Sequence, residues 1–336
     1  MKKRLLALLL CAAMLLALLG CTTASAKSVD LMQGVEPLPV EPEGAFSREG
    51  AAAITRFGLQ LLGGTLDGEG SNAMVSPLSV ISALAMTAQG AKGETLEEME
   101  QVFGLELDEL RRWLLAFRAT LPDEEGCKLS LANAIWFKDT PSFAVNQEFL
   151  QTNASWYGAD LYKAPFNDTT QKEINRWVEE NTDGMIRNIL DRIPESAVMY
   201  LVNALAFDGE WASIYNEGQI RESTFTTEAG EVQPVEMMYN KENRYLETDC
   251  ATGFIKRYKG GQYAFAALLP KAGYTVADCA SLLQGMALEE LLIHPSQEPV
   301  HTGLPKFESE YTVELSGRSE ERRVGKECRS RWSPYH

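Results

Sequence analysis

The residue types that carry most enzyme chemistry are few in this chain of 336 residues, and their spacing fits no common active site. Its three histidines, His294, His301 and His336, all come late in the sequence, which argues against a catalytic triad or a histidine-rich metal site. The chain also contains no G-x-S-x-G, S-x-x-K, H-E-x-x-H, Walker or C-x-x-C pattern. We therefore predict a protein that is not an enzyme and that uses no cofactor or metal ion.

The most informative polar side chain is Asn203, an amide inside an otherwise apolar run from Val198 to Phe207. The run ends at an Asp208-Gly209 turn, so it predicts a strand that is buried on both faces in the middle of a sheet. A buried amide without hydrogen-bond partners costs roughly 1–3 kcal/mol. Asn203 is therefore either a single satisfied core residue or part of a hydrogen-bond network that crosses the sheet.

Along the sequence, the predicted elements that position this amide are mainly helices at first and mainly strands later. Ser76 and Pro77 supply the capping residue and the first residue of a helix. The β-branched and aromatic content of residues 129–137 indicates a second buried strand. After Trp211 the pattern is mainly one of short strands, up to a last strand at residues 303–315. Because strands and helices do not alternate strictly, we predict an α+β fold.

The N-terminus is typical of an exported bacterial lipoprotein. Residues 1–21 combine a basic start with an apolar run, Leu5 to Leu19, that is too short to cross a bilayer. The run ends in Leu-Gly-Cys, which resembles the lipobox, so Cys21 is expected to carry a lipid. That lipid would anchor the protein on the extracellular side of the cell membrane, with secretion as the alternative. The acidic, proline-rich residues 22–46 favour extended conformations over packing and predict a linker.

The remaining composition argues against a nucleic-acid partner and against a disulfide framework. The formal net charge of −16 is opposite in sign to what phosphate binding needs. Of the six cysteines, Cys127, Cys250 and Cys279 are scattered through apolar or loop segments, and we expect them to be free buried thiols.

The chain resembles the serpin family of protease inhibitors in seven collinear segments. They are NAMVSPLSVISALAMTAQGAKGETLEEM, LANAIWF, INRWVEENTDGMI, YLVNALAFDGEW, RESTF with PVEMM, GGQYAFAALLP and TGLPKFESEYTVEL. The resemblance implies a serpin fold over residues 47–316, with a helical N-terminal part and three mixed β-sheets. It also implies two functional regions of the main sheet, the shutter with Ser76, Ser79 and Asn203, and the breach with Trp211 and Lys306.

Each of these residues also has a simpler interpretation. Ser76 is suited to cap a helix, Trp211 to fill a core, and Lys306 to solvate the end of a strand. The simpler and the functional interpretations are compatible, so the sequence leaves both in place.

The resemblance also implies a mechanism and a partner. In a serpin, the serine of a target protease attacks an exposed reactive-centre loop, and the cleaved loop inserts into the main sheet before the acyl-enzyme hydrolyses. The expected partner is therefore a serine protease, or a cysteine protease, and the expected state of the protein is a monomer. The alternative is a non-inhibitory lipoprotein of serpin fold that has a binding or structural role.

The end of the chain departs from the family pattern. In serpins the strand near Leu315 is followed by a helix, another long strand, the reactive-centre loop and further strands, and none of these is recognisable here. Residues 317–336 carry six basic and three acidic side chains, and we interpret them as a foreign basic tail, with a genuine basic tail as the alternative. The absent segments would include a histidine that pairs with Asn203 and a glutamate that pairs with Lys306. The chain as printed is therefore expected to be inactive.

Overall fold

A computed structural model describes residues 27–41, 47–66, 72–141, 143–284 and 288–309 of the chain. Within these residues the helices lie mostly in the first half and the strands mostly in the second, and the strands form three sheets. The predicted α+β class with three sheets is confirmed. The largest sheet, called the main sheet below, combines parallel and antiparallel pairs, while the described strands of the two smaller sheets are all antiparallel.

The main sheet has the order β1-β4-β3-β2, and β5 pairs with β3. Its strands are β1 (Val29–Asp30), β2 (Asp123–Glu124), β3 (Cys127–Lys138), β4 (Ala159–Ala164) and β5 (Met199–Gly209). The two strands predicted around residues 129–137 and 198–207 are β3 and β5. They run antiparallel with Asn133 directly opposite Asn203, so the asparagines of the two runs meet in the sheet.

The prediction that this strand is buried on both faces is wrong for β5. Val202, Ala204 and Ala206 are buried, but the residues between them, which face the other side, are only half-buried. Within the described residues β5 also has a strand on one side only, so it lies at an edge of the described sheet rather than in its middle.

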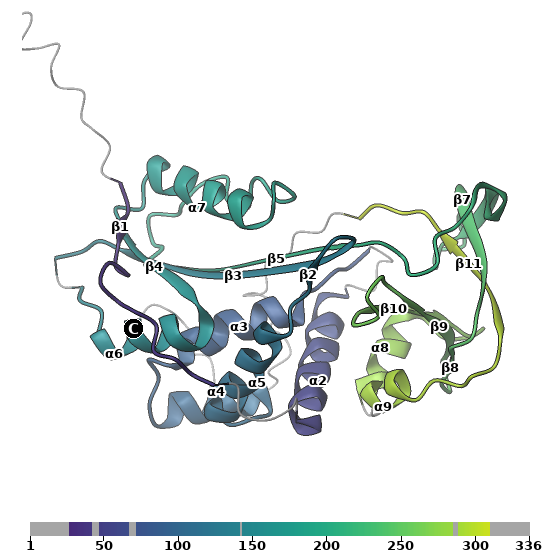
Figure 1. The fold of residues 1–336 in the computed structure, drawn as a ribbon, viewed down its shortest axis with the longest axis horizontal. Helices are drawn as coiled ribbons and strands as arrows, with labels where there is room; N and C mark the ends of the chain where they lie inside the picture. The colour runs from purple at the N-terminus through teal and green to yellow at the C-terminus, as the bar shows by residue number, and fades with distance from the viewer. Residues whose placement is uncertain (1–26, 42–46, 67–71, 142, 285–287, 310–336) are drawn as a thin grey trace, which may run out of the picture.

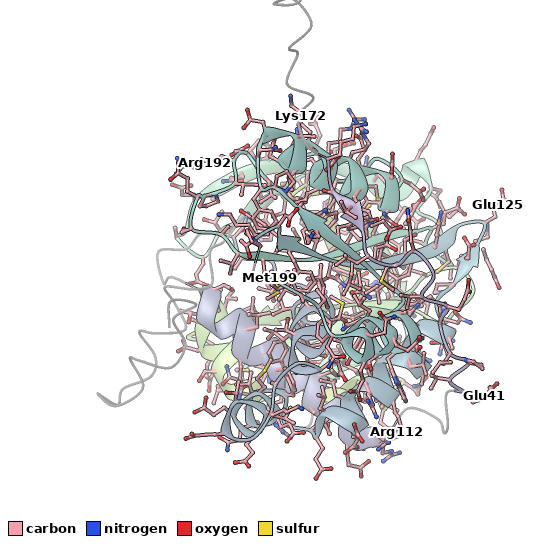
Figure 2. All side chains as sticks on the ribbon, turned by 90° about the vertical axis from the view of Figure 1, so that its left-hand side faces the viewer. Glu41, Arg112, Glu125, Lys172, Arg192 and Met199 are labelled. Carbon is pink, nitrogen blue, oxygen red and sulfur yellow. The ribbon has the colours of Figure 1, made fainter. Side chains whose placement is uncertain are left out.

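Helices cover both faces of the main sheet (Figure 1). One layer contains α2 (Arg48–Thr65), α3 (Pro77–Ala88), α4 (Glu94–Phe103), α5 (Leu107–Ala119), α6 (Gln147–Thr152) and the π-helical turn η1 (Asn153–Tyr157). The opposite face carries α7 (Asp168–Asn181). Figure 2 shows this sandwich from one end, with Lys172 of α7 on one side, Arg112 of α5 on the other and Met199 of β5 between them.

Alternate residues of β3 fill the cores of these two layers. Ile135 and Phe137 join the larger core with the helices of the first layer, whereas Ala134 and Trp136 join a smaller core with α7. This alternation is the period-two pattern of a strand, so β3 is covered by apolar side chains on both of its faces.

The two smaller sheets lie at the far end of the molecule (Figure 1). One has the order β10-β9-β8 and lies beside two short helices. Its elements are β8 (Tyr245–Glu247), β9 (Ala251–Arg257), β10 (Ala264–Pro270), α8 (Val276–Gln284) and α9 (Leu288–Ile293). The other has the order β11-β7-β6, with the 3-10 turn η2 (Glu217–Gln219) before β6. Its strands are β6 (Ile220–Thr226), β7 (Val232–Glu242) and β11 (Val300–Pro305).

The N-terminal segment differs from the extended linker that the sequence predicts. Residues 27–41 are indeed extended for the most part, but they pack on the body. Val29 and Asp30 pair with β4, and the Leu31 backbone N–H donates to the Leu161 carbonyl at 2.9 Å. Farther along, the Leu38 N–H donates to Ser155 Oγ at 2.9 Å. The expectation that this composition avoids packing is therefore wrong for residues 27–41.

Several predictions concern residues outside the described ones. The signal peptide at residues 1–21, the lipidated Cys21 and the basic tail at residues 317–336 all fall there, as does the end of the strand predicted at 303–315. Among the described residues, no helix combines the length and the apolar character that a membrane crossing requires.

Candidate functional site

Asn203 belongs to a hydrogen-bond network that starts in the main sheet. Its Nδ2 donates to Oδ1 of Asn133 on the neighbouring strand at 2.7 Å. Asn133 is 2 % exposed, and its own Nδ2 donates to the backbone carbonyl of Tyr157 at 3.0 Å. The network therefore joins β5, β3 and η1, and the alternative of an isolated, self-contained core asparagine is wrong.

The network continues from η1 to the helix beneath the sheet. The hydroxyl of Tyr157 accepts a hydrogen bond from Gln89 Nε2 at 2.7 Å and donates to the Ala85 carbonyl at 3.4 Å. Tyr157 is 1 % exposed, and this burial raises the pKa of its hydroxyl above the ordinary range. The hydroxyl therefore stays protonated and can donate and accept at the same time. Asn203, Asn133, Tyr157 and Gln89 are called the amide network below.

One atom of the amide network has no partner among the described residues. Oδ1 of Asn203 is buried, and no described donor lies within hydrogen-bond distance of it. A buried acceptor in this condition costs roughly 1–3 kcal/mol. Oδ1 of Asn203 can therefore accept one further hydrogen bond.

Ser76 and Ser79 lie at the start of α3, which packs against β5. Ser76 Oγ accepts from the backbone N–H of Ser79 at 3.3 Å and lies 2.8 Å from Ser79 Oγ. The interpretation of Ser76 as a helix cap is thus confirmed. The described contacts include no direct hydrogen bond from either serine to Asn203, so the structure brings the serines to the same strand without linking them to the amide.

Trp211 and Lys306 meet at the end of the main sheet, where the chain passes to the smaller sheets. Both line a cavity of about 270 Å³ whose other walls are mainly apolar. The Trp211 ring stacks on Tyr258 with centroids 4.5 Å apart and meets Phe265 edge-on. Lys306 Nζ pairs with Glu236 Oε2 at 3.1 Å, with 47 % and 59 % of the two side chains exposed. Trp211, Lys306, Tyr258, Phe265 and Glu236 are called the aromatic corner below.

A buried ion pair that the sequence analysis missed lies beside the aromatic corner. Lys256 Nζ is 2.9 Å from Glu242 Oε1, and its side chain is only 2 % exposed. The ammonium also lies 5.6 Å from the Trp211 ring and 4.5 Å from the Tyr215 ring. Lys256 lies in β9 two residues after Phe254, so both side chains are on one face of the strand, and this alternation is the signal that could have indicated its burial.

The amide network includes residues that the sequence analysis also did not single out. Asn133 is the only amide in the apolar run LANAIWF, which is the same signal that marked Asn203. Gln89 lies at the end of a helix and gave no comparable signal. Among the described residues, no group of three or more His, Cys, Asp or Glu side chains is placed to hold a metal ion. The described contacts of the site are hydrogen bonds, stacked aromatic rings and two ion pairs.

Comparisons with known proteins point to one family. A sequence profile described as Serpin (serine protease inhibitor) matches residues 52–318. An uncharacterized serpin-like protein of Thermococcus kodakarensis is 31% identical over 74% of this chain and 60% of its own length. Human Serpin B11 is 32% identical over 51% of this chain and 49% of its own length. The chain thus spans less than two thirds of the length of these relatives.

The fold also matches solved structures of serpins. The crystal structure of the thermophilic serpin tengpin in its native state has a TM-score of 0.83 and 37% sequence identity. The match covers 88% of this chain and 76% of the tengpin chain. The latent state of the same protein matches less well, with a TM-score of 0.74.

Proposed function

Since the chain belongs to the serpin family, we propose that its complete form traps serine proteases, or cysteine proteases, by inserting a cleaved loop into the main sheet beside β5. Serpins are in general protease inhibitors rather than enzymes, and their partners are proteases. The observation that carries the proposal is that β5 pairs with a strand on one side only among the described residues; the same strand carries Asn203, whose Oδ1 has no described partner. An inserted strand would supply backbone partners along that edge.

In this mechanism the target protease supplies the chemistry. Its serine attacks the exposed loop and forms an acyl-enzyme, and loop insertion then carries the attached protease away before water completes hydrolysis. The driving force is new main-chain pairing at the edge of β5, together with relief of strain in the uncut protein. The chain itself contributes no nucleophile; it contributes a sheet that can take another strand.

Within this proposal the two regions of the main sheet have different roles. Ser76, Ser79 and Asn203 form the shutter, where the amide network holds β5 to β3 and to the underlying helix. Trp211 and Lys306 form the breach, where the inserting loop enters the sheet. The exposed Lys306–Glu236 pair is weak enough to be exchanged for another partner during insertion.

The cell-surface location of the protein is part of the proposal. We expect a lipid at Cys21 and residues 47–316 as the inhibitory domain of a monomer outside the cell, with residues 27–41 packed on that domain rather than serving as a free linker. The change Cys21→Ala should release the protein or leave it unprocessed. Membrane attachment with an unchanged mature mass would contradict the anchor.

The inhibitory function is tested with a chimera. It joins residues 22–309 of this chain to the C-terminal region of tengpin from the equivalent point of the fold onward. The chimera and the printed chain are each incubated with trypsin-like, chymotrypsin-like, elastase-like, subtilisin-like and papain-like proteases, and the products are separated on denaturing gels. We expect a detergent-stable band at the summed mass for the chimera and none for the printed chain.

The matched control is the same chimera with prolines in the hinge of its loop, which blocks strand pairing but leaves the bait residue in place. This control should be cleaved without forming a complex. If the unmodified chimera is also only cleaved, the body cannot take an inserted strand, and the non-inhibitory alternative with a binding or structural role is favoured.

A further inference from the structure

Two buried cysteines from different elements meet at the turn of the β8–β9 hairpin. Cys250 lies in the turn before β9 and is 1 % exposed, and Cys279 lies in the first part of α8 and is 6 % exposed. The Cys279 thiol donates to the backbone carbonyl of Cys250, with Sγ and O 3.3 Å apart across 29 residues of sequence. Burial and the adjacent Cys250 thiol raise the pKa of Cys279 to about 11. The two side chains are therefore direct neighbours.

The turn that carries Cys250 is held in place from several sides. Thr248 Oγ1 accepts from the backbone N–H of Ala251 at 2.9 Å and lies 3.5 Å from Cys250 Sγ. The Cys250 carbonyl also accepts from the backbone N–H of Lys271 at 2.7 Å. Cys250, Ala251 and Cys279 form one small apolar cluster with Leu268 of β10. The hydrogen bonds of the turn and the apolar cluster thus fix the positions of the two thiols.

We propose that Cys250 and Cys279 are a dithiol modification site that takes a small disulfide such as glutathione disulfide and becomes an intramolecular disulfide. The bond would join the turn before β9 to α8 and close a loop that contains β9 and β10. Because such a loop restricts the unfolded chain, the oxidised protein should resist unfolding better than the reduced protein. This role does not depend on protease inhibition.

The reaction balances as a thiol–disulfide exchange. One thiolate of the pair attacks a sulfur of glutathione disulfide, which releases one glutathione thiolate and leaves a mixed disulfide. The second cysteine then attacks the protein sulfur of that mixed disulfide, forms the Cys250–Cys279 bond and releases the second glutathione. The two thiol protons pass to the two glutathione thiolates, and the two electrons of the dithiol reduce the glutathione disulfide.

The high pKa of Cys279 has a kinetic consequence. The thiolate is the attacking species, so a raised pKa keeps Cys279 protonated near neutral pH and slows the exchange. The rate should therefore increase as the pH is raised toward 9, by more than the rate of a thiol with an ordinary pKa of about 8.5.

The test uses the full chain in buffers with increasing ratios of oxidised to reduced glutathione. Samples are oxidised both as folded protein and during dilution from urea, trapped with an alkylating reagent and digested for mass spectrometry. We expect a linked peptide pair that contains Cys250 and Cys279, two hydrogen masses lighter than the separate peptides. Cys127, which is also buried, is the internal control and should remain alkylatable when unfolded.

Variants separate the bond from general oxidation. The changes Cys250→Ser and Cys279→Ser should each remove the linked pair and the increase in urea midpoint on oxidation, while Cys127→Ser should retain both. The proposal is overturned if Cys250 and Cys279 stay as alkylatable as Cys127 in both oxidation protocols. A link from either cysteine to Cys127 or to a second chain, in place of the Cys250–Cys279 link, would also overturn it.

Discussion

The amide network begins on β5 and the aromatic corner begins just after its end, at Trp211, and the two regions are built in opposite ways. In the network, neutral amides and a phenol hydroxyl hydrogen-bond to one another, and its two central residues, Asn133 and Tyr157, are 2 % and 1 % exposed. In the corner, the polar contact is a half-exposed ion pair beside stacked rings. Buried hydrogen bonds depend strongly on geometry, whereas exposed ion pairs contribute little. The comparison indicates that the amide network resists disruption more strongly than the ion pair of the aromatic corner.

The largest effect should come from Asn133→Ala at the centre of the network. The change removes the partner of Asn203 Nδ2 and the donor to the Tyr157 carbonyl. Since two buried groups lose partners, we expect a loss of about 3 kcal/mol in the free energy of unfolding. The measurement is urea unfolding, with the exposed Asn188→Ala as the control. A midpoint shift no larger than that of the control would contradict the network.

Asn203→Ala should have a smaller effect than Asn133→Ala. It removes one hydrogen bond, and it also removes the buried Oδ1 that lacks a partner among the described residues. We expect a loss of about 1–2 kcal/mol with an unchanged urea slope. In the chimera, which adds further strands, the loss should be larger. Equal losses in the two proteins would show that Oδ1 gains no partner from those strands.

Tyr157→Phe should cost about 1 kcal/mol, because the ring stays and only the hydroxyl bonds to Gln89 and Ala85 are lost. It should also change the response to alkali. The pKa of Tyr157 is raised in the folded protein, so the unfolded chain ionises first and stability falls as the pH rises above about 10. The decline between pH 9 and 11 should be shallower for the variant. If stability falls equally with pH in Tyr157→Phe and in the unchanged protein, the Tyr157 hydroxyl is exposed to solvent and the burial argument is wrong.

The smallest effect is expected in the aromatic corner. Glu236→Gln removes the charge that faces Lys306, but both side chains are about half exposed. After allowance for solvent screening, we expect a change below about 0.5 kcal/mol that disappears as salt is added. A loss in the free energy of unfolding that is independent of salt and as large as that of Asn203→Ala would contradict the proposed difference between the two regions.

The sequence identified individual residues of these regions, but it did not identify the residues with which they pair. Asn203 was found because it interrupts an apolar run, and Asn133 interrupts the run of β3 in the same way. Their pairing depends on the antiparallel register of strands 70 residues apart, which no local pattern specifies. The Lys306–Glu236 pair likewise depends on how β11 aligns with β7.

Burial was the other property that local patterns predicted poorly. Lys256 is a charged residue inside a core because Glu242 neutralises it and aromatic rings surround it. Residues 27–41 have a composition that favours solvent, yet Leu31, Met32 and Val35 find an apolar surface on the body. In both cases the decisive partner lies far away in the sequence, so tertiary packing overrides the local preference.

The most direct test of the account is hydrogen exchange along β5 in the chimera, before and after reaction with a protease that it traps. The β5 amides that do not bond to β3 should become strongly protected after the reaction, while those bonded to β3 stay protected throughout. That result would show a strand added at the edge of β5. Unchanged protection on β5, or new protection at the opposite edge near β4, would contradict insertion beside Asn203.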